Sequence, residues 1–458
     1  MESSAYYICE KCGWSNNIMV KPQFRCPKCG SALYIDYEID FSNSPRFDEK
    51  TAGIWRYSSL LPDFPQKPTL GEGGTFLSNA KRLRSVFGLK NLYIKDERRN
   101  PTGAFTDRGA AVVAAAALYY GFKGIWSRVG GNIAASLSAY AAASDLRFFV
   151  DFREKPQLGK LYQVIFFGGE IIDHKTPGVD VYTVTPQDPF LIEGYKTIVF
   201  ELFEDLKHID LLIVPMGHGT LAFSLWKGLK ELKRAGLLDY IPRIIGVQAS
   251  SCQPIVEAFR KNLEEPVECE DGFTIASELL VRRPLRGKDA LRALRDTGGY
   301  ALAVTDREIV NGLKMLAKYE GLLVETASAA AIAALKKLVE EAMIERGENI
   351  VVLATGAGLK HPQTLLRILE VKDLEETPLI GRTGLTILEL LSQKEMHGYA
   401  VWKELVQKRN ISKPTIYYHL KRLEELGLIK KLSYPDRKTF TITSKGVKIL
   451  RKLKFYSY

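Results

Sequence analysis

The chain has 458 residues, of which 46% are hydrophobic and 26% charged, and its formal net charge is +11. The composition is globular, and the length excludes a single ordinary domain and predicts two or three. No apolar run reaches the roughly 18 residues that a membrane-spanning helix needs, and the first residues lack the basic and apolar regions of a signal peptide. We therefore expect a cytoplasmic protein with no membrane partner.

Residues 1–40 carry four of the six cysteines as two Cys-x2-Cys pairs, each followed directly by a glycine. Such turns point two thiolates at one ion, and four thiolates complete a tetrahedral zinc site with no open position. We therefore predict a structural zinc ribbon whose ligands are Cys9, Cys12, Cys26 and Cys29. Disulfides are the alternative, which a reducing cytosol disfavours.

Residues 41–370 alternate short β-rich runs with longer helical patterns. The runs are 91–95, 211–215 and 244–248, and two alanine-rich helical patterns cover 107–120 and 328–346. Gly121 and Gly347 follow these two patterns and are expected to stop the helices. The alternation predicts an α/β fold with a doubly wound core.

One part of this core resembles a family signature. The residues Lys95-Asp96-Glu97 and then NPTGAFTDRG at 100–109 are similar to the KDE and NPTGSFKDRG stretch of threonine synthases, which are fold-type II pyridoxal-phosphate enzymes. Similar stretches occur in the family's order, with LGEGGT at 70–75 before this segment and IEGYKT at 192–197, PRIIGVQASSCQP at 242–254, ETASAA at 325–330 and LATGAGLKHP at 353–362 after it. The resemblance covers about residues 1–370 and implies a small subdomain at about 115–190.

Thr106 stands where the resembled motif has the lysine that holds the cofactor. Pyridoxal phosphate needs a primary amine for its covalent link, and the same lysine usually moves protons, whereas a threonine hydroxyl does neither. Lys95, Lys196 and Lys360 fall where the family motifs already have lysines, so they do not replace it. We expect Thr106 to be the N-cap of the following helix and pyridoxal phosphate, if it binds, to be held only noncovalently.

Two further departures concern the substrate. Residues 127–133, SRVGGNI, resemble the loop that receives a substrate carboxylate, and Asn132 is retained there, but Gly130 and Ile133 replace hydroxyl residues. An isoleucine side chain cannot donate a hydrogen bond to a carboxylate. The stretch 173–187 is shorter than in the family and lacks its helix, which weakens the prediction of a closing lid.

Two features of a cofactor pocket are retained. The residues MGHGT at 216–220 resemble the family's phosphate cup, in which backbone N–H groups at a helix N-terminus surround an anion; a plain strand-to-helix turn is the alternative. Thr355 matches the hydroxyl residue that faces the pyridine nitrogen. The candidate ligand-binding residues are therefore Asn132, Gly217, His218, Gly219, Thr220 and Thr355.

The excess positive charge lies at the end of the chain. Residues 379–458 contain 17 Lys or Arg and 6 Asp or Glu, which accounts for the whole net charge of +11 and leaves residues 1–378 neutral overall. Before this module, Pro378, Gly381 and Gly384 break the helical pattern and predict a linker over 371–384. Net positive charge concentrated in one terminal module is typical of proteins that bind phosphate groups, as nucleic-acid-binding proteins do.

The basic module resembles a PadR-type winged helix-turn-helix over residues 385–458. Its sequence predicts helices at 385–392, 398–408, 412–426 and 445–455, and a hairpin at 428–443. On the third helix, Ile416, Leu420, Leu423 and Leu426 recur at helical spacing and are expected in the core. The candidate DNA-binding residues, on the remaining face and at the tip of the wing, are Lys413, Thr415, Tyr418, His419, Lys421, Arg422, Arg437 and Lys438. A protein-docking module is the alternative.

These features favour a transcription regulator. In this hypothesis a disabled threonine synthase-like domain senses a phosphate-bearing or amino-acid ligand or supplies a dimer interface, and the winged helix reads double-stranded DNA. A homodimer is expected because both resembled families commonly dimerise. One alternative is a working pyridoxal-phosphate lyase or β-replacement enzyme that uses another amine and regulates its own operon; the other is a scaffold in which neither site keeps its role.

Overall fold

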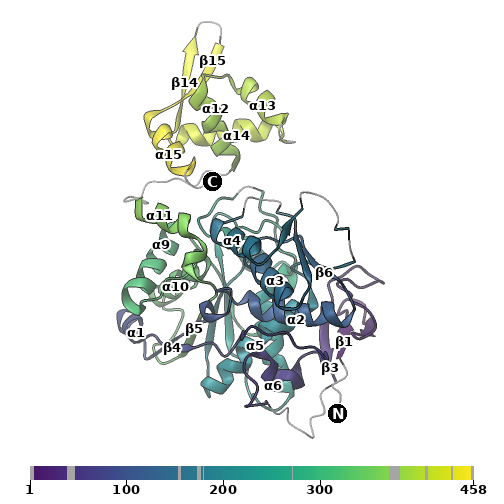
Figure 1. The fold of residues 1–458 in the computed structure, drawn as a ribbon. Helices are drawn as coiled ribbons and strands as arrows, with labels where there is room; N and C mark the ends of the chain where they lie inside the picture. Colours follow the sequence, from purple (N-terminus) through teal and green to yellow (C-terminus); the bar gives the residue numbers. More distant parts are fainter. Residues whose placement is uncertain are drawn as a thin grey trace. The chain divides into compact units, whose positions relative to one another are not determined.

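The computed structural model describes residues 5–38, 47–152, 156–172, 177–178, 180–270, 272–370, 382–407, 411–434 and 437–454 (Figure 1). Contacts divide the chain into two compact units. The first comprises residues 1–268 and 276–362, and the second comprises residues 269–275 and 363–458. Within the described segments, no helix combines the length and the apolar character needed to cross a membrane.

A small antiparallel sheet begins the first unit. Its central strand is β1 (Ala5–Ile8), which pairs with β2 (Ser15–Asn17) and with β3 (Tyr34–Tyr37). The two cysteine-bearing turns end at Gly13 (φ 70°) and Gly30 (φ 71°). Residues with a side chain rarely adopt this left-handed conformation, so the two glycines allow each pair of cysteines to lie on a tight turn.

A six-stranded sheet forms the centre of the first unit, in the order β12-β11-β10-β13-β5-β4. All neighbours are parallel except β4, which runs antiparallel to β5 at one edge. All five residues of β10 are buried, as expected for a strand covered on both faces. The strands are β4 (Leu77–Asn79), β5 (Asn91–Asp96), β10 (Leu211–Pro215), β11 (Arg243–Ala249), β12 (Tyr300–Val304) and β13 (Asn349–Ala354).

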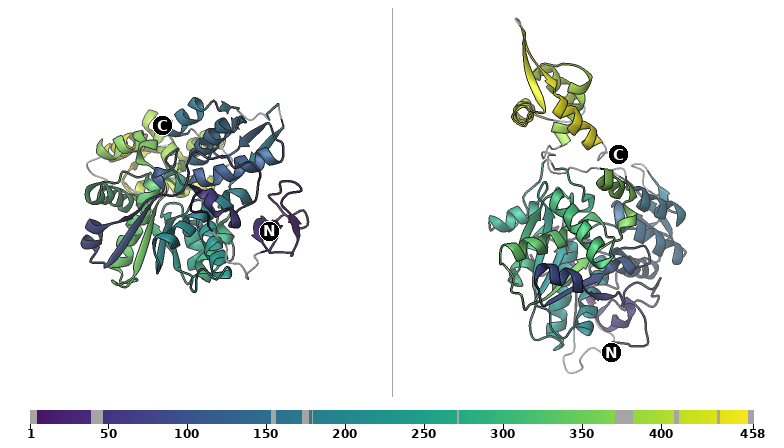
Figure 2. Two further views of the ribbon diagram at one scale, coloured as in Figure 1. Left: turned by 60° about the horizontal axis from the view of Figure 1, so that its bottom comes forward. Right: turned by 90° about the vertical axis from the view of Figure 1, so that its left-hand side faces the viewer.

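Helices flank this sheet on both sides, as Figures 1 and 2 show. The longer ones are α2 (Thr106–Tyr119), α5 (Pro189–Asp205), α6 (Thr220–Arg234), α8 (Gly287–Asp296), α9 (Asp306–Met315) and α10 (Thr326–Glu340). Shorter helices are α1 (Lys81–Phe87) and α7 (Pro254–Arg260), whereas α11 (Pro362–Glu370) falls almost entirely in the second unit. The sheet and its helices confirm the α/β fold with a doubly wound core.

A second, four-stranded parallel sheet has the order β8-β7-β6-β9. Its strands are β6 (Gly124–Ser127), β7 (Arg147–Val150), β8 (Glu170–Ile171) and β9 (Val181–Val184), and α3 (Gly131–Ala143) and α4 (Leu158–Phe166) connect them. These elements lie inside the range expected for the small subdomain. Between β8 and β9, the described residues 172, 177–178 and 180 form no helix, in agreement with the shortened stretch in the sequence.

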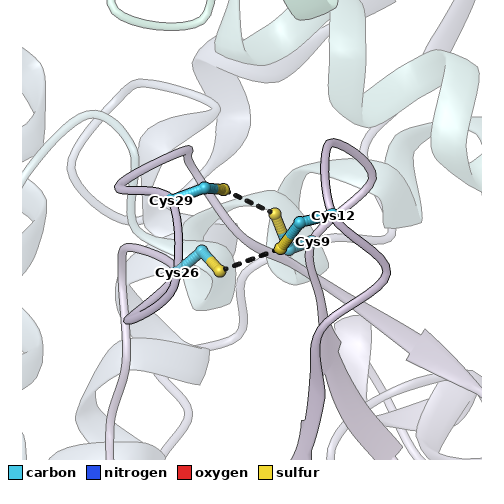
Figure 3. A group of neighbouring side chains, drawn as sticks. All are labelled: Cys9, Cys12, Cys26 and Cys29. Atoms are coloured by element: carbon cyan, nitrogen blue, oxygen red, sulfur yellow. Dashed lines mark hydrogen bonds between the residues drawn. The ribbon is translucent and has the colours of Figure 1, made fainter.

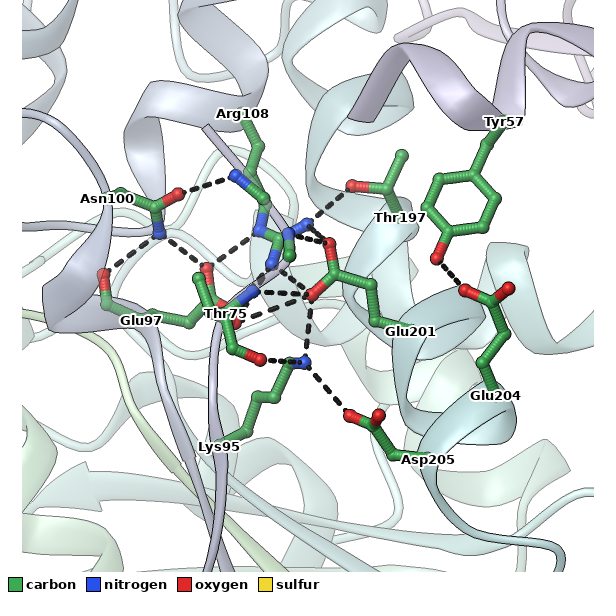
Figure 4. Close-up of polar contacts among 12 residues, drawn as sticks. Tyr57, Thr75, Lys95, Glu97, Asn100, Arg108, Thr197, Glu201, Glu204 and Asp205 are labelled. Atoms are coloured by element: carbon green, nitrogen blue, oxygen red, sulfur yellow. Dashed lines mark hydrogen bonds and ion pairs between the residues drawn. The ribbon is translucent and has the colours of Figure 1, made fainter. Parts of the chain in front are cut away.

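A buried ion-pair network fixes the start of α2. The Arg108 guanidinium, with no exposed surface, binds the carboxylates of Glu97 and Glu201 through contacts of 2.7–2.8 Å (Figure 4). The Lys95 ammonium binds Glu201 at 2.8 Å and donates to the carbonyl of Thr75 at 2.7 Å. Burial opposes ionisation, but Arg108 and Lys95 lower the pKa of Glu201 to about 2. The residues beside Thr106 are therefore held rigidly by paired charges.

The second unit contains a winged helix-turn-helix. Its elements are α12 (Arg382–Gln393), α13 (Gly398–Val406), α14 (Lys413–Glu425), β14 (Ile429–Tyr434), β15 (Arg437–Ile442) and α15 (Ser444–Lys454). Ile416, Leu420 and Leu423 are buried in its apolar core, as predicted, and Leu426 packs against that core while partly buried. Pro414 lies in the first turn of α14, where its missing N–H is tolerated.

The structure corrects several boundaries. The helix expected at 328–346 is α10 (Thr326–Glu340), which ends before Gly347 because Ala342 has a left-handed φ of 53°. The predicted linker 371–384 lies outside the described residues up to residue 381, and Arg382–Gly384 already belong to α12. The segment IEGYKT at 192–197 lies within α5, and its glycine is needed because a Cβ at Gly194 would lie 2.1 Å from the Arg108 carbonyl.

Candidate functional sites

The four cysteines of the N-terminal ribbon converge on one point. The Sγ atoms of Cys9 and Cys29 lie 3.4 Å apart and those of Cys12 and Cys26 lie 3.5 Å apart (Figure 3). All four sulfur atoms lie within 4.8 Å of one another. Zinc–sulfur bonds of about 2.3 Å in a tetrahedron place sulfur atoms about 3.8 Å apart, so this group has the size of a four-thiolate zinc site.

Most of the candidate ligand residues of the core follow the carboxyl ends of neighbouring strands in the six-stranded sheet. Gly217 to Thr220 follow the end of β10, Thr355 follows the end of β13, and Thr106 follows the loop after β5. These three strands are neighbours, with β13 in the middle. In α/β folds ligands bind outside the carboxyl ends of parallel strands, so this end of the sheet is the candidate site.

Thr106 is buried but does not cap α2 with its side chain. Phe105, at the N-cap position, already has helical dihedral angles (φ −56°, ψ −21°), so Thr106 lies inside the first turn. Its hydroxyl instead hydrogen-bonds with the Ser136 hydroxyl on α3 at 2.7 Å and donates to the Asn132 carbonyl at 3.3 Å. The predicted N-cap role is therefore wrong, although the hydroxyl does have a structural role between α2 and α3.

Asn132 and Thr355 lie close to Thr106 through shared partners. The Asn132 amide donates to Glu325 Oε2 at 2.8 Å. The hydroxyls of Thr355 and Ser328 hydrogen-bond at 2.9 Å, and the Thr355 carbonyl accepts the Phe105 N–H at 3.0 Å. The structure therefore brings the retained asparagine, the retained threonine and the replaced lysine position together.

The glycine-rich turn leads directly into the N-terminus of α6. Gly219 (φ 87°) is the N-cap of α6, and no described side chain caps it. A Cβ at Gly217 would lie 2.6 Å from the Glu278 carbonyl, and one at Gly219 would lie 2.8 Å from the Arg286 carbonyl. The open helix N-terminus has the donors to bind a phosphate, and both positions require glycine.

Two side chains of this turn are already constrained. The Thr220 hydroxyl donates to the Pro186 carbonyl at 2.9 Å, so it holds the adjacent loop. Burial lowers the pKa of His218 to about 4, so this imidazole is neutral at pH 7. The anion would therefore be bound mainly by the backbone.

The sequence did not reveal a buried polar cluster formed by Lys160, Glu278, Glu325 and His361. Lys160 lies on α4, Glu278 on the 3-10 helix Ser277–Leu279, Glu325 at the start of α10 and His361 after the 3-10 helix Gly358–Lys360. The Lys160 ammonium contacts Glu278 and His361, and lies 3.3 Å from Glu325 Oε1. Lys160 shares the buried face of α4 with Val164, four residues later, which was the available signal.

These residues fit pyridoxal phosphate only in part. The α6 N-terminus can bind a phosphate, and Thr355 provides a hydroxyl at the end of the neighbouring strand β13, but Thr106 provides no amine for a covalent link. A second lysine lies nearby, because Lys360 Nζ donates to the Thr102 carbonyl at 2.6 Å, and Thr102 and Thr106 both hydrogen-bond to Ser136. Burial lowers the pKa of Lys360 to about 8.

In the second unit, α14 presents an exposed polar face. Its exposed residues include Lys413, Tyr417, Tyr418, Lys421 and Arg422, and Thr415 is partly exposed. The Arg422 guanidinium donates to the Tyr418 hydroxyl at 3.4 Å, and Lys421 Nζ lies 3.9 Å from the Glu425 carboxylate. Tyr417 is also exposed (43%), but only its neighbour Tyr418 was predicted from the sequence as a DNA-binding candidate.

The structure corrects His419, which is only 9% exposed. It follows Ile416 by three residues, so helical spacing turns its ring toward the apolar core rather than toward solvent. The remaining two candidates, Arg437 and Lys438, lie on β15, but their side chains are outside the described residues.

Comparison with known families and proteins identifies both units. The family model for pyridoxal-phosphate dependent enzymes matches residues 68–356. A threonine synthase from Methanocaldococcus jannaschii is 38% identical over 384 residues, covering 79% of this chain and 94% of that protein. A threonine synthase from Methanosarcina acetivorans is 33% identical and covers 79% and 94%.

A solved structure supports the fold of the core. An L-serine ammonia-lyase from Rhizomucor miehei has a TM-score of 0.56 and 18% identity, and the match covers 64% of this chain and 97% of that chain. The model of the transcriptional regulator PadR-like family matches residues 387–452. The chain therefore belongs to the pyridoxal-phosphate dependent enzyme family, with threonine synthases among its relatives, and carries a PadR-like domain at its C-terminal end.

Proposed function

We propose that the protein is a DNA-binding transcription regulator whose threonine synthase-like domain senses a small ligand without catalysing a reaction. The observation that carries the proposal is the exposed face of α14, where Lys413, Lys421 and Arg422 lie together with Tyr418. A helix of this kind in the major groove contacts phosphates and base edges with such side chains. Residues 379–458 also hold the whole net positive charge of the chain.

In this proposal the core supplies ligand recognition. The open N-terminus of α6 would bind a phosphate-bearing or amino-acid ligand, and pyridoxal phosphate, if it binds, would be held noncovalently because Thr106 has no amine. When bound, pyridoxal phosphate supplies an electron sink for amino-acid chemistry. The zinc ribbon would be structural, and a homodimer in the cytoplasm would present two copies of α14.

The chain offers a covalent route from the ligand site to the DNA-binding unit. Residues 269–275 belong to the same compact unit as the winged helix, and the chain then continues into the 3-10 helix Ser277–Leu279. Glu278 of this helix belongs to the buried cluster of the core.

A second candidate function is a pyridoxal-phosphate dependent enzyme that uses another amine. Lys360 favours it, because its pKa of about 8 leaves a fraction of this buried amine neutral at pH 7. An enzyme of this kind would show a lysine-linked cofactor, which the regulator would not.

DNA footprinting tests the first proposal. The full chain should protect one site upstream of its own gene, an inverted repeat with half-sites about 34 to 36 Å apart if the protein is a dimer. Binding should weaken steeply with salt because Lys and Arg side chains release counterions from DNA. Equal binding to random and upstream DNA, or none at physiological salt, would favour a protein-docking module instead.

A further inference from the structure

The buried cluster of the core contains a carboxylate that contacts both Lys160 and His361. Glu278 Oε1 contacts both Lys160 Nζ and His361 Nε2, and these two nitrogens lie 2.5 Å apart. Glu325 Oε1 lies farther away, 3.3 Å from Lys160 and 3.4 Å from His361. Glu278 is therefore the group that directly compensates the two nitrogens.

The members of the cluster differ in their access to solvent. The side chains of Lys160, Glu325 and His361 are 1–2% exposed, whereas that of Glu278 is 19% exposed. The second carboxylate oxygen of Glu278 is buried and has no hydrogen-bond partner among the described residues, so leaving it unpaired costs free energy. Glu278 is thus both the most exposed member of the cluster and an incompletely paired one.

Electrostatics oppose an unpaired cation at this position. Burial disfavours the charge of Lys160, but Glu278 and Glu325 raise its pKa. Burial also lowers the pKa of His361, and Glu278 more than offsets this effect. A buried charge that loses its partner is strongly destabilising, so whatever replaces Glu278 must itself be an anion.

A metal ion is a poorer interpretation of the same side chains. The ligand atoms of Glu278, Glu325 and His361 lie within 4.8 Å of one another, a spacing that could hold a cation. However, Lys160 Nζ already contacts Glu278 and His361 and lies 3.3 Å from Glu325. The ammonium group of Lys160 therefore already occupies the position that a metal ion would take.

We propose that Glu278 occupies an anion site and that a phosphate- or carboxylate-bearing ligand enters the core by displacing it from Lys160 and His361. This inference rests on the proposed ligand-sensing function and identifies the class of the ligand. The incoming anion takes over both contacts, and the Glu278 carboxylate moves into solvent. Phosphate and carboxylate share the required charge and acceptor oxygens.

Isothermal titration calorimetry of the full chain at pH 7 tests the site. The probes are inorganic phosphate, O-phospho-L-serine and L-glutamate, each added without pyridoxal phosphate. Glu278→Gln removes the internal competitor and should bind phosphate at least tenfold more tightly than the wild-type chain. Adding Lys160→Met to Glu278→Gln should remove this gain in affinity, and Glu264→Gln, at a side chain that is 85% exposed, should bind as the wild type does.

Glu278→Asp provides a second reading if Glu278→Gln does not fold. The shorter side chain keeps the charge but cannot reach both nitrogens, so phosphate should bind several-fold more tightly. Binding of O-phospho-L-serine but not L-glutamate would identify a phosphate ligand, and binding of both would identify a carboxylate-tolerant site.

The proposal is overturned if the folded Glu278 variants bind phosphate no more tightly than Glu264→Gln, if Glu278→Gln keeps its gain in affinity when Lys160→Met is added, or if no probe binds any variant. DNA binding by the wild-type chain is measured separately, without these anions. Its loss would contradict the regulator function and leave the calorimetric result standing, so the two failures can be told apart.

Discussion

The threonine synthase-like core and the winged helix use positive charge in opposite ways. In the core, Arg108 and Lys95 are fully buried and paired with the carboxylates of Glu97 and Glu201. In the winged helix, Lys421 is 79% exposed, and its nearest carboxylate is 3.9 Å away on the same helix. Charge therefore stabilises the fold of the core, whereas on α14 it remains available to a partner.

The largest effect should come from the buried pairs. Arg108→Met leaves Glu97 without its paired cation and Glu201 with Lys95 alone, and should lower the free energy of unfolding by about 3 to 5 kcal/mol. Arg147→Ala breaks the exposed pair with Glu170 and should cost at most about 1 kcal/mol. Chemical denaturation measures both. Equal costs would contradict the contrast between buried and exposed charge.

Zinc removal should act on the ribbon alone. Replacing Cys9 and Cys26 together by serine should release one metal ion per chain, because two thiolates cannot complete the tetrahedral site. Proteolysis should then cut within the N-terminal 40 residues, while DNA affinity should change only indirectly. Metal analysis that finds the same zinc content in this variant and in the wild type would refute the assignment.

On α14, Arg422→Ala should weaken specific DNA binding by about 1 to 3 kcal/mol if the guanidinium reads a base edge, and relax specificity at that position. Lys438→Ala should weaken all sequences alike and reduce the salt slope by about 1 if it contacts a phosphate. Gel shifts over a range of salt concentrations measure both effects. An unchanged slope and an unchanged site preference in both variants would count against recognition by this module.

His419→Ala provides the matched comparison on the same helix. Since the ring is buried against the core, its removal should reduce the stability of the winged helix by about 1 kcal/mol, with site preference unchanged. Thermal unfolding and gel shifts of the same sample separate the two effects. A loss of specificity at full stability would restore the sequence-based assignment of His419 to the DNA-reading face.

The sequence predicted the features that depend on local spacing. The Cys-x2-Cys turns brought four thiols together, and the strand-end motifs placed Thr106, Asn132 and Thr355 in one neighbourhood. Local spacing could not predict contacts between distant segments, because Lys160 and Glu278 are 118 residues apart in the sequence and meet only after the core has folded. The N-cap prediction for Thr106 was wrong because Phe105 already has helical dihedral angles. The burial of His419 was not predicted, although its position three residues after Ile416 indicated it, and its contact with DNA stays a prediction.

The central claim is that the core works without a lysine-linked cofactor, and borohydride reduction tests it most directly. The full chain is mixed with pyridoxal phosphate, its visible spectrum is recorded, and the reduced protein is mapped by peptide mass spectrometry. We predict no pyridoxyl-modified lysine in residues 41–370, and a yellow, reducible chromophore only in Thr106→Lys. Stoichiometric modification of a lysine in this range of the wild-type chain, Lys360 in particular, would contradict the account.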